Sequence, residues 1–492
     1  MTAWLLAAAI TVEAGWGTCR PSDAPLPVRV EAVGGEGDYH GRLLITDARQ
    51  NVVELPIDLP RGAHKRWRVP MPAGAGIARA DWDGAAGDAV LVQTIPHPVC
   101  GGALVGVLDR AAGTSVRFPA ANESGSVRSF AVGAVVPEDF DAPWQTLDTL
   151  DAIVAEARAL SDLSETRFLA LRTWVLAGGL LVVTPGADPA PLLASGRLPG
   201  TVALTGPVLS ESPWGQGAVL SIPVAAPDPT SNDAAALRAR IWLQTAERAE
   251  ARTQRALLRR ALASSVGPGT ARGGVPLVAL AIFAATLGAA HELMRRRWVT
   301  RVKHLSEYAT ILGGSVVALG VVSFVIARST LAESSGNSVR IFQEGAAIAR
   351  RVDAVPLLPG ESVEIPVDAV LEAEDSVRVH LGTPSTAEVM GPLVRIGAAW
   401  SAWDAGGAIR IVRVPGGFEI TNGTHENLGE GTLFDRPSAY AVPPIRAGGS
   451  ATLTRPLPLV PEIPVAAPFA GDATHYVSRV DRGWVVVRAG TK

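Results

Sequence analysis

The chain has 492 residues, of which 48% are hydrophobic and 18% are charged, and its net formal charge is −3. A chain of this length exceeds one ordinary hydrophobic core, and about two to four domains are expected. The near balance of charge excludes a general electrostatic footprint for nucleic acid, so no nucleic-acid partner is expected.

The N-terminal residues 1–14 are a candidate signal peptide. A short apolar run ends at Val12-Glu13-Ala14, which resembles a small-residue cleavage site. No Lys or Arg precedes the run, which is unusual for such a segment. A cleaved signal peptide would place the rest of the chain outside the cytoplasm.

Residues 15–102 are predicted to form a β-sandwich. Apolar and polar residues alternate in short runs, and Gly, Pro and Asp clusters separate these runs about every ten residues. The runs lie at 28–32, 42–46, 52–55, 65–69 and 89–93.

Residues 103–231 are predicted to form a flavodoxin-like α/β domain. The runs 104–108, 130–136 and 180–184 are continuously apolar, as in the buried strands of parallel sheets. Ser164 is a suitable N-cap for a helix that reaches Ala177, and Gly178 ends that helix. A strand, a helix and a second strand in this order indicate a βαβ unit.

Residues 232–274 are predicted to be a basic helix followed by a linker. The helix begins near Asn232, runs to about Ala263 and is rich in Arg. It either rests on anionic lipid headgroups or covers the preceding sheet with its Arg side chains in solvent, and both alternatives stay open.

A transmembrane hairpin is predicted from two apolar segments, 275–294 and 308–327. Each has about 20 residues, the length that crosses the hydrocarbon core. The loop between them, 295–307, is basic, which favours the cytoplasmic side and leaves both soluble regions outside the cytoplasm. Its basic residues are Arg295, Arg296, Arg297, Arg301 and Lys303.

Residues 328–492 return to β-strand patterns and are predicted to form a C-terminal β-sandwich-like region. Runs such as 376–381 and 408–414 alternate, and Asn422-Gly423 and Gly448-Gly449 supply turns. The expected fold class is therefore multidomain α/β plus all-β, with a membrane hairpin between the soluble regions.

The stretch 143–186 resembles the class I glutamine amidotransferase-like domain, in the version found in uncharacterised bacterial envelope proteins. The resemblance lies in Pro143-Trp144, in 150–154 and in the helix and strand from Leu163 to Val183. Residues 12–16, 59–65 and 420–428 also resemble that group. The resemblance implies a signal sequence, a β-domain, a flavodoxin-like domain and membrane helices, but no established activity.

This sequence departs from the active amidotransferases, which carry a Cys on a Gly-flanked elbow and a distant His-Glu pair. Cys100 precedes the first strand of the α/β domain, and Gly-x-Cys-x-Gly does not occur. The resemblance therefore implies a degenerate domain. Cys100 and Cys19 either form one disulfide or have no joint role.

The candidate chemistry lies in two groups of residues. His97 and Cys100 are three positions apart, and a carboxylate cluster follows the predicted strand at 130–136. Loop capping and solvation are the alternative roles of these carboxylates. The cluster consists of Asp139, Asp141, Asp148 and Asp151. Phosphate-binding and zinc-hydrolase motifs do not occur, so no cofactor and no metal is expected.

These features predict a membrane-anchored extracytoplasmic binding or scaffolding protein of the bacterial cell envelope, without catalytic activity. Its expected partners are the lipid bilayer and other envelope proteins. The alternative is a hydrolase or amidotransferase-like enzyme that uses Asp139 and Asp141 or Cys100.

Overall fold

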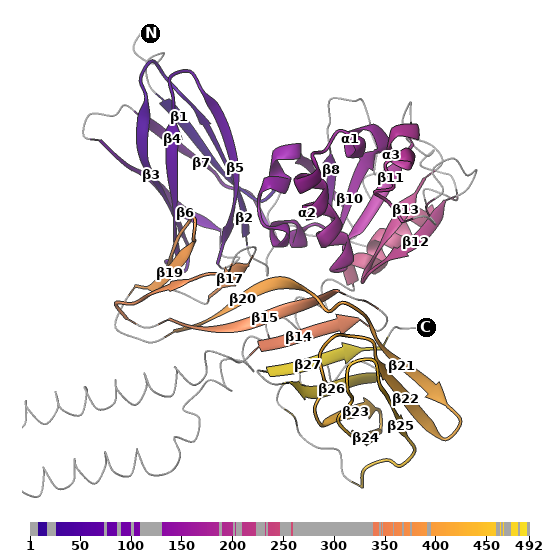
Figure 1. Ribbon diagram of the computed structural model, residues 1–492. Coiled ribbons are helices and arrows are strands. Elements are labelled where there is room, and N and C mark those ends of the chain that lie inside the picture. Colours follow the sequence, from indigo (N-terminus) through magenta and orange to yellow (C-terminus); the bar gives the residue numbers. More distant parts are fainter. Residues whose placement is uncertain are drawn as a thin grey trace, which may run out of the picture.

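The molecule is built mainly from β-strands (Figure 1). Its twenty-seven strands with defined bounds form five sheets, whereas the helices in the described part of the chain are short. The computed structural model describes residues 8–16, 26–72, 76–85, 90–99, 103–108, 130–185, 189–199, 209–222, 235–246, 338–343, 348–357, 359–366, 369–373, 376–390, 395–458, 474–480 and 483–489, the pair 257–258 and the single positions 202, 232, 346, 463 and 466.

The N-terminal region is a β-sandwich, as predicted. One sheet has the strand order β5-β2-β1-β7, and the facing sheet has the order β16-β19-β18-β4-β3-β6. Alternate side chains of the strands point into one shared apolar core, which explains the alternating sequence pattern. The strands of this region are β1 (Ala8–Ala14), β2 (Leu26–Val33), β3 (Tyr39–Asp47), β4 (Val52–Leu59), β5 (His64–Met71), β6 (Ile77–Gly84) and β7 (Val90–Ile95).

Strand β1 corrects the boundary expected at residue 14. The segment 8–14, assigned above to the candidate signal peptide, pairs with β2 on one side and with β7 on the other. Ile10 and Val12 are fully buried in the sandwich core. Cleavage after Ala14 would remove this central strand, so the sandwich includes residues 8–14.

A second sheet system is mostly parallel, with the order β12-β13-β11-β10-β8-β9. Its central strands are buried along their whole length, which is why their sequences are continuously apolar. Helix α2 begins after the predicted N-cap Ser164, whose Oγ accepts a hydrogen bond from Arg167 N–H. The elements are β8 (Ala103–Leu108), β9 (Phe130–Val135), η3 (Pro137–Asp141), η4 (Trp144–Thr149), β10 (Ala152–Glu156), α1 (Ala157–Ser161), α2 (Glu165–Leu176), β11 (Leu180–Thr184), α3 (Ala190–Ala194), β12 (Ser210–Trp214) and β13 (Gly217–Ser221).

The predicted fold class, with a flavodoxin-like α/β domain, is wrong for this mostly β molecule. The connection from β9 to β10 consists of the 3-10 segments η3 and η4, not of an α-helix. Pro137 begins η3 and Pro143 precedes η4. The side chain of Asp139 accepts a hydrogen bond from the N–H of Val136. These local bonds favour short turns over a continuous helix. Among the described helices with full bounds, α2 alone exceeds six residues.

The helical stretch 235–246 covers one face of the parallel sheet. Leu237 and Ile241 are buried against its strands, and Gln244 donates a hydrogen bond to Gly178 O at 2.7 Å. This placement agrees with the second alternative for the basic helix. Arg240 pairs with Glu211 of β12 rather than with a headgroup.

The C-terminal part is not a separate sandwich. An eight-stranded sheet of order β17-β20-β15-β14-β27-β26-β23-β24 packs against a three-stranded sheet of order β21-β22-β25, and strands β16, β18 and β19 leave this region to join the N-terminal sandwich. In Figure 1 the long orange strands pass beneath the other two units. The strands are β14 (Ser338–Gln343), β15 (Ile348–Leu357), β16 (Ser362–Glu364), β17 (Val370–Glu372), β18 (Val377–His380), β19 (Thr386–Val389), β20 (Arg395–Asp404), β21 (Ile409–Val414), β22 (Gly417–Asn422), β23 (Gly431–Asp435), β24 (Ser438–Val442), β25 (Ser450–Leu453), β26 (Thr474–Val480) and β27 (Gly483–Arg488).

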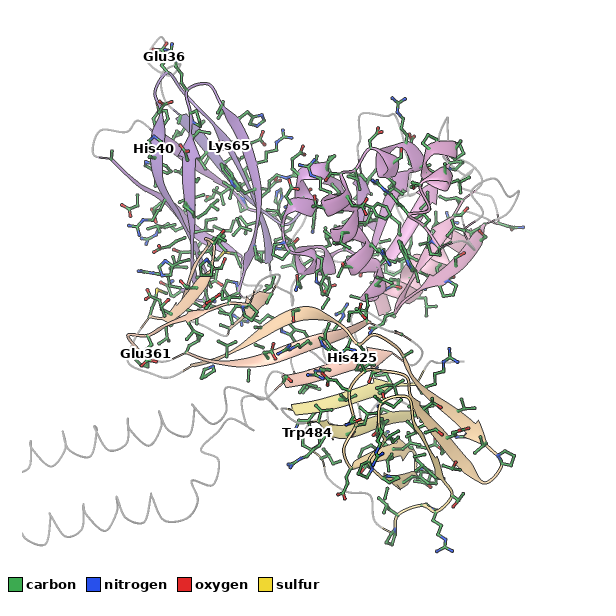
Figure 2. All side chains as sticks on the ribbon, in the orientation of Figure 1. Glu36, His40, Lys65, Glu361, His425 and Trp484 are labelled. Atoms are coloured by element: carbon green, nitrogen blue, oxygen red, sulfur yellow. The ribbon has the colours of Figure 1, made fainter. Side chains whose placement is uncertain are left out.

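Side chains fill the space between the sheets of the sandwich and between the two C-terminal sheets (Figure 2). The predicted membrane hairpin, at 275–294 and 308–327, lies outside the described residues, and so does its basic loop. In the ranges that are described, no helix combines the length and apolar character needed to cross a bilayer.

Candidate functional site

A chain of charged side chains crosses the junction between the sandwich and the parallel sheet. In order along this chain lie His97, Glu13, Arg29, Asp139 and Arg68. Four of the residues belong to the sandwich or directly follow its strand β7, and Asp139 lies in η3. The guanidiniums of Arg29 and Arg68 alternate with the carboxylates of Glu13 and Asp139, and the His97 ring contacts Glu13 at one end. Two of the sequence-predicted candidates, His97 and Asp139, are thus brought into one network.

Asp139 is the centre of this charge chain. Its Oδ1 accepts hydrogen bonds from Nε and Nη2 of Arg68, at 3.0 and 2.8 Å. Its Oδ2 accepts the N–H of Val136 at 3.0 Å and lies 3.5 Å from Nη2 of Arg29. Both oxygens of this buried carboxylate are therefore engaged with partners, which is the arrangement that makes a buried charge tolerable.

Arg68 is fully buried and has partners on all sides. Its Nη1 donates to Gly15 O at 2.8 Å, and its guanidinium lies 4.1 Å above the ring of Trp16. Burial lowers the pKa of Arg68 to about 10, and the opposing charge of Asp139 limits that decrease. Trp16 in turn donates to Thr149 Oγ1 at 2.7 Å, which adds an uncharged contact across the same junction.

The other end of the chain is at the surface. His97 Nε2 and Glu13 Oε1 are 2.7 Å apart, and Arg29 Nη1 lies 3.8 Å from Glu13 Oε2. Arg29 also donates to Ala134 O of β9 at 3.0 Å. The side chains of His97, Glu13 and Arg29 are 13%, 17% and 18% exposed, whereas those of Arg68 and Asp139 are 0% and 5% exposed, so this end of the network is the more accessible to a ligand.

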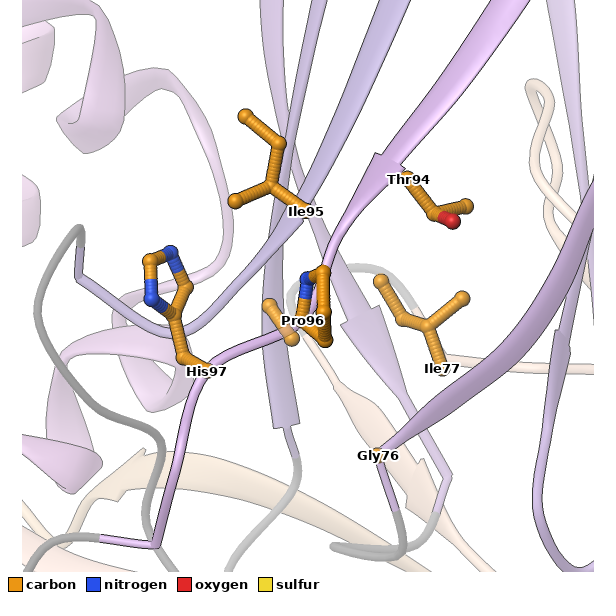
Figure 3. A pocket seen from close by; sticks show the side chains of 7 residues that line it. Gly76, Ile77, Thr94, Ile95, Pro96 and His97 are labelled. Atoms are coloured by element: carbon orange, nitrogen blue, oxygen red, sulfur yellow. The ribbon is translucent and has the colours of Figure 1, made fainter.

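A cavity of about 230 Å³ lies beside His97 (Figure 3). It is formed where β1 ends, β6 begins and β7 ends, at one open side of the sandwich. Its lining combines the aliphatic side chains of Ile77 and Ile95 with the polar groups of Thr94 and His97, and neither kind predominates. The lining residues are Ala14, Gly76, Ile77, Thr94, Ile95, Pro96 and His97.

The other predicted carboxylates do not gather around a shared cavity. Asp141 forms a two-pronged ion pair with Arg167 at the surface, with distances of 2.8 and 2.7 Å. Asp148 is buried and lies 3.4 Å from Nη2 of Arg350 in β15. Asp151 is buried, and its Oδ2 accepts the N–H of Leu104 at 2.7 Å, which fixes the start of β8.

Cys100 and Cys19 lie outside the described residues, so the Cys-His pairing and the disulfide stay predictions. No group of three or more His, Cys, Asp or Glu within the described ranges is arranged to hold a metal ion. Within the described residues, the network consists of two carboxylates, two guanidiniums and the imidazole of His97.

Sequence reasoning missed Glu13, Arg29, Arg68 and Trp16. Glu13 lay within the candidate signal peptide, and Arg29 and Arg68 belonged to alternating strands in which a charge normally faces solvent. The sequence carried no signal for the burial of Arg68, because Val69 beside it points into the sandwich core and Arg68 therefore points to the opposite face of the strand. The partner, 71 positions away, could not be read from spacing.

The junction holds two modules together through buried ion pairs, and a small cavity of mixed polar and apolar lining lies at its open end. Comparison of the chain with family models, with curated proteins and with solved structures finds no match. The resemblance to the amidotransferase-like envelope proteins accordingly stays a prediction from sequence.

Proposed function

We propose that this chain is a binding or scaffolding protein of the bacterial cell envelope and does not act as a catalyst. The observation that supports this most strongly is that both carboxylate oxygens of Asp139 are engaged by structural partners. This carboxylate has the strand-end position that a catalytic group would need, yet Arg68, Arg29 and a backbone N–H engage both of its oxygens. Its role is to fix the parallel sheet on the sandwich.

Contacts between the residues before 247 and those after 337 support a rigid scaffold. Strand β18 lies parallel to β4, and Gln145 donates to Trp400 O at 2.6 Å. Gln216 donates to Ile348 O at 3.0 Å. Residues before and after 247–337 thus share sheets and cores, so both halves must lie on one side of any bilayer that the connecting segment enters. The membrane location itself rests on sequence alone.

An activity assay tests the proposal against an enzyme. The purified full chain is incubated with glutamine and, separately, with a chromogenic ester, and ammonia or chromophore release is measured. We expect no release above that of the variants Asp139→Asn and Cys100→Ser. Turnover by the native chain that either variant abolishes would establish the enzyme instead.

Localisation is tested with a reporter fused after Lys492. We expect the fusion to be active only in the form that works outside the cytoplasm, and to stay with the membrane fraction. A reporter that is active in the cytoplasm would refute the proposed location while leaving the fold unchanged.

A further inference from the structure

Strand β7 is an open edge of the sandwich. In the described part of the chain it pairs with β1 alone, so its other side presents unpaired backbone groups. Its sequence, Val-Leu-Val-Gln-Thr-Ile, carries no charge, and Leu91 is 49% exposed. An uncharged edge of six residues is a ready template for another strand.

The other sheet edges in the described ranges are protected in ways that β7 is not. Strands β5, β6, β12 and β21 carry charges or proline, and β16, β17 and β25 have only three or four residues. Strand β9 is covered by Arg29 and Trp16, and β24 by residues 456–457. Since edges are normally blunted in these ways, the exception at β7 indicates a strand that receives a partner.

The cavity described above lies at the end of this same edge. Ile95 and Thr94 of β7 form part of its wall, and Ile77 of the facing strand β6 forms another part (Figure 3). Its volume of about 230 Å³ is below the roughly 300 Å³ at which pockets for whole small ligands begin. A cavity of this size can hold one side chain, and Ile77 and Ile95 offer that side chain an apolar contact.

We propose that β7 binds an extended, uncharged peptide segment of a partner protein, which adds a strand to the sheet and places one apolar side chain in the cavity. Backbone hydrogen bonds along β7 give affinity, and the cavity selects the anchoring side chain, as in other cases of strand addition. His97 lines the cavity, and its contact with Glu13 fixes the position of its ring. The inference rests on the proposed binding function and names its partner class.

The probe is a displayed library of random nine-residue peptides, selected against the full chain. Dissociation constants of the selected peptides are then measured for the native chain and for Leu91→Lys, which gives β7 the charge that blunts other edges. Val412→Lys is the matched control, because Val412 is 50% exposed on the edge strand β21. We expect about tenfold weaker binding for Leu91→Lys and no change for the control.

Two further variants separate backbone pairing from the cavity. Successive N–H groups of a strand point to opposite edges, so one of Gln93→Pro and Thr94→Pro removes an N–H that faces the open edge. The variant of this pair that keeps the native melting temperature should lose peptide binding. Thr94→Phe fills the cavity and should weaken only peptides that have a large apolar anchor.

Amide exchange supplies the decisive readout. Bound peptide should slow exchange in residues 90–95 and leave β21 unchanged. Selected peptides that bind all variants equally, or that protect another strand, would overturn the site but leave a binding function in place. Failure to select any peptide would also overturn it. A dimer of the native chain that Leu91→Lys dissociates would show that a second copy occupies the edge, and the proposal would be wrong.

Discussion

At the scale of single residues, Arg68 and Asp139 form an ion pair whose two side chains are both buried. Two ions taken out of water gain little net stability over an apolar pair, but either ion alone is very unfavourable. The Arg68 side chain has no exposed surface and that of Asp139 has 5%, so water cannot replace a lost partner. The pair therefore adds little to the free energy of unfolding, but it penalises any arrangement of the two modules that separates Arg68 from Asp139.

Replacing Arg68 with Met should lower the free energy of unfolding by about 3–5 kcal/mol, since Asp139 would remain charged and underpaired. Chemical denaturation followed by tryptophan fluorescence measures this loss. The double variant Arg68→Met/Asp139→Asn should be more stable than the single variant Arg68→Met. If the losses in free energy of unfolding from the two single substitutions simply add in the double variant, the two side chains are not coupled and the prediction is wrong.

A second residue-scale prediction concerns Glu31 in β2. Burial raises its pKa, but hydrogen bonds from His64 and Arg66 outweigh this effect and lower the pKa below 4.5. Because the folded pKa is lowered, the contribution to stability is present above pH 4.5 and is lost as the pH falls through the folded pKa.

The test compares the native chain with Glu31→Gln by denaturation at several pH values. The native chain should be the more stable of the two above pH 4.5, and the difference should shrink in acid. Glu36→Gln, in the turn after β2, is the control and should follow the native curve. A difference that stays constant with pH would contradict the assignment.

At the scale of elements, the contact between β9 and the sandwich depends on a missing side chain. A Cβ at Gly133 would lie 2.5 Å from the Cβ of Trp16 and 3.0 Å from its carbonyl oxygen. The strand can approach Trp16 this closely only with glycine at that position. The approach also lets Arg29 reach the backbone of Ala134.

Gly133→Ala should therefore destabilise the protein by about 1–3 kcal/mol through overpacking. The expected result is a lower melting temperature, measured by circular dichroism. Gly37→Ala is the control, because a Cβ there would meet only ordinary contacts near 3.9 Å. Equal melting temperatures for the two variants would show that the strand can shift without cost.

Several elements follow directly from local chemistry. Ser164 and Gly178 delimit α2, and the apolar runs of β8, β10 and β11 form buried parallel strands. The 3-10 segments η3 and η4 were not predicted. In η3, Asp139 caps the N–H of Val136 with one oxygen while Arg68 of the distant strand β5 holds the other. Rules based on neighbouring residues cannot predict a contact with an Arg 71 positions away in the sequence.

At the scale of the whole molecule, the chain closes on itself across the segment 247–337. Val377 N–H donates to Asn51 Oδ1 at 3.1 Å, and His380 Nδ1 lies 2.8 Å from Glu54 Oε2. Residues of both halves also contribute to the core of the sandwich. Neither half contains the complete set of strands around that core.

Fragments 1–246 and 338–492 should accordingly fail to fold when produced separately and should assemble when produced together. Without β18, one hydrogen-bonding edge of β4 loses its neighbour, and without β4, strands β16, β18 and β19 have no sheet to extend. Size-exclusion chromatography and dispersion of amide NMR signals measure the outcome. A well-dispersed spectrum from 338–492 alone would contradict the shared sheet.

The sequence by itself determined many of the strands and the N-cap of α2, because alternation, capping and turn residues act over a few positions. It did not determine β1, which was assigned to a signal peptide, or the β-rich character of the molecule as a whole. Tertiary structure alone decided which strands pair. The alternation in Val377–His380 is the same whether the strand completes a C-terminal sheet or, as it does, the N-terminal sandwich. It also decided the roles of Asp139 and Glu13, since a carboxylate acquires its function from a partner that long-range packing supplies.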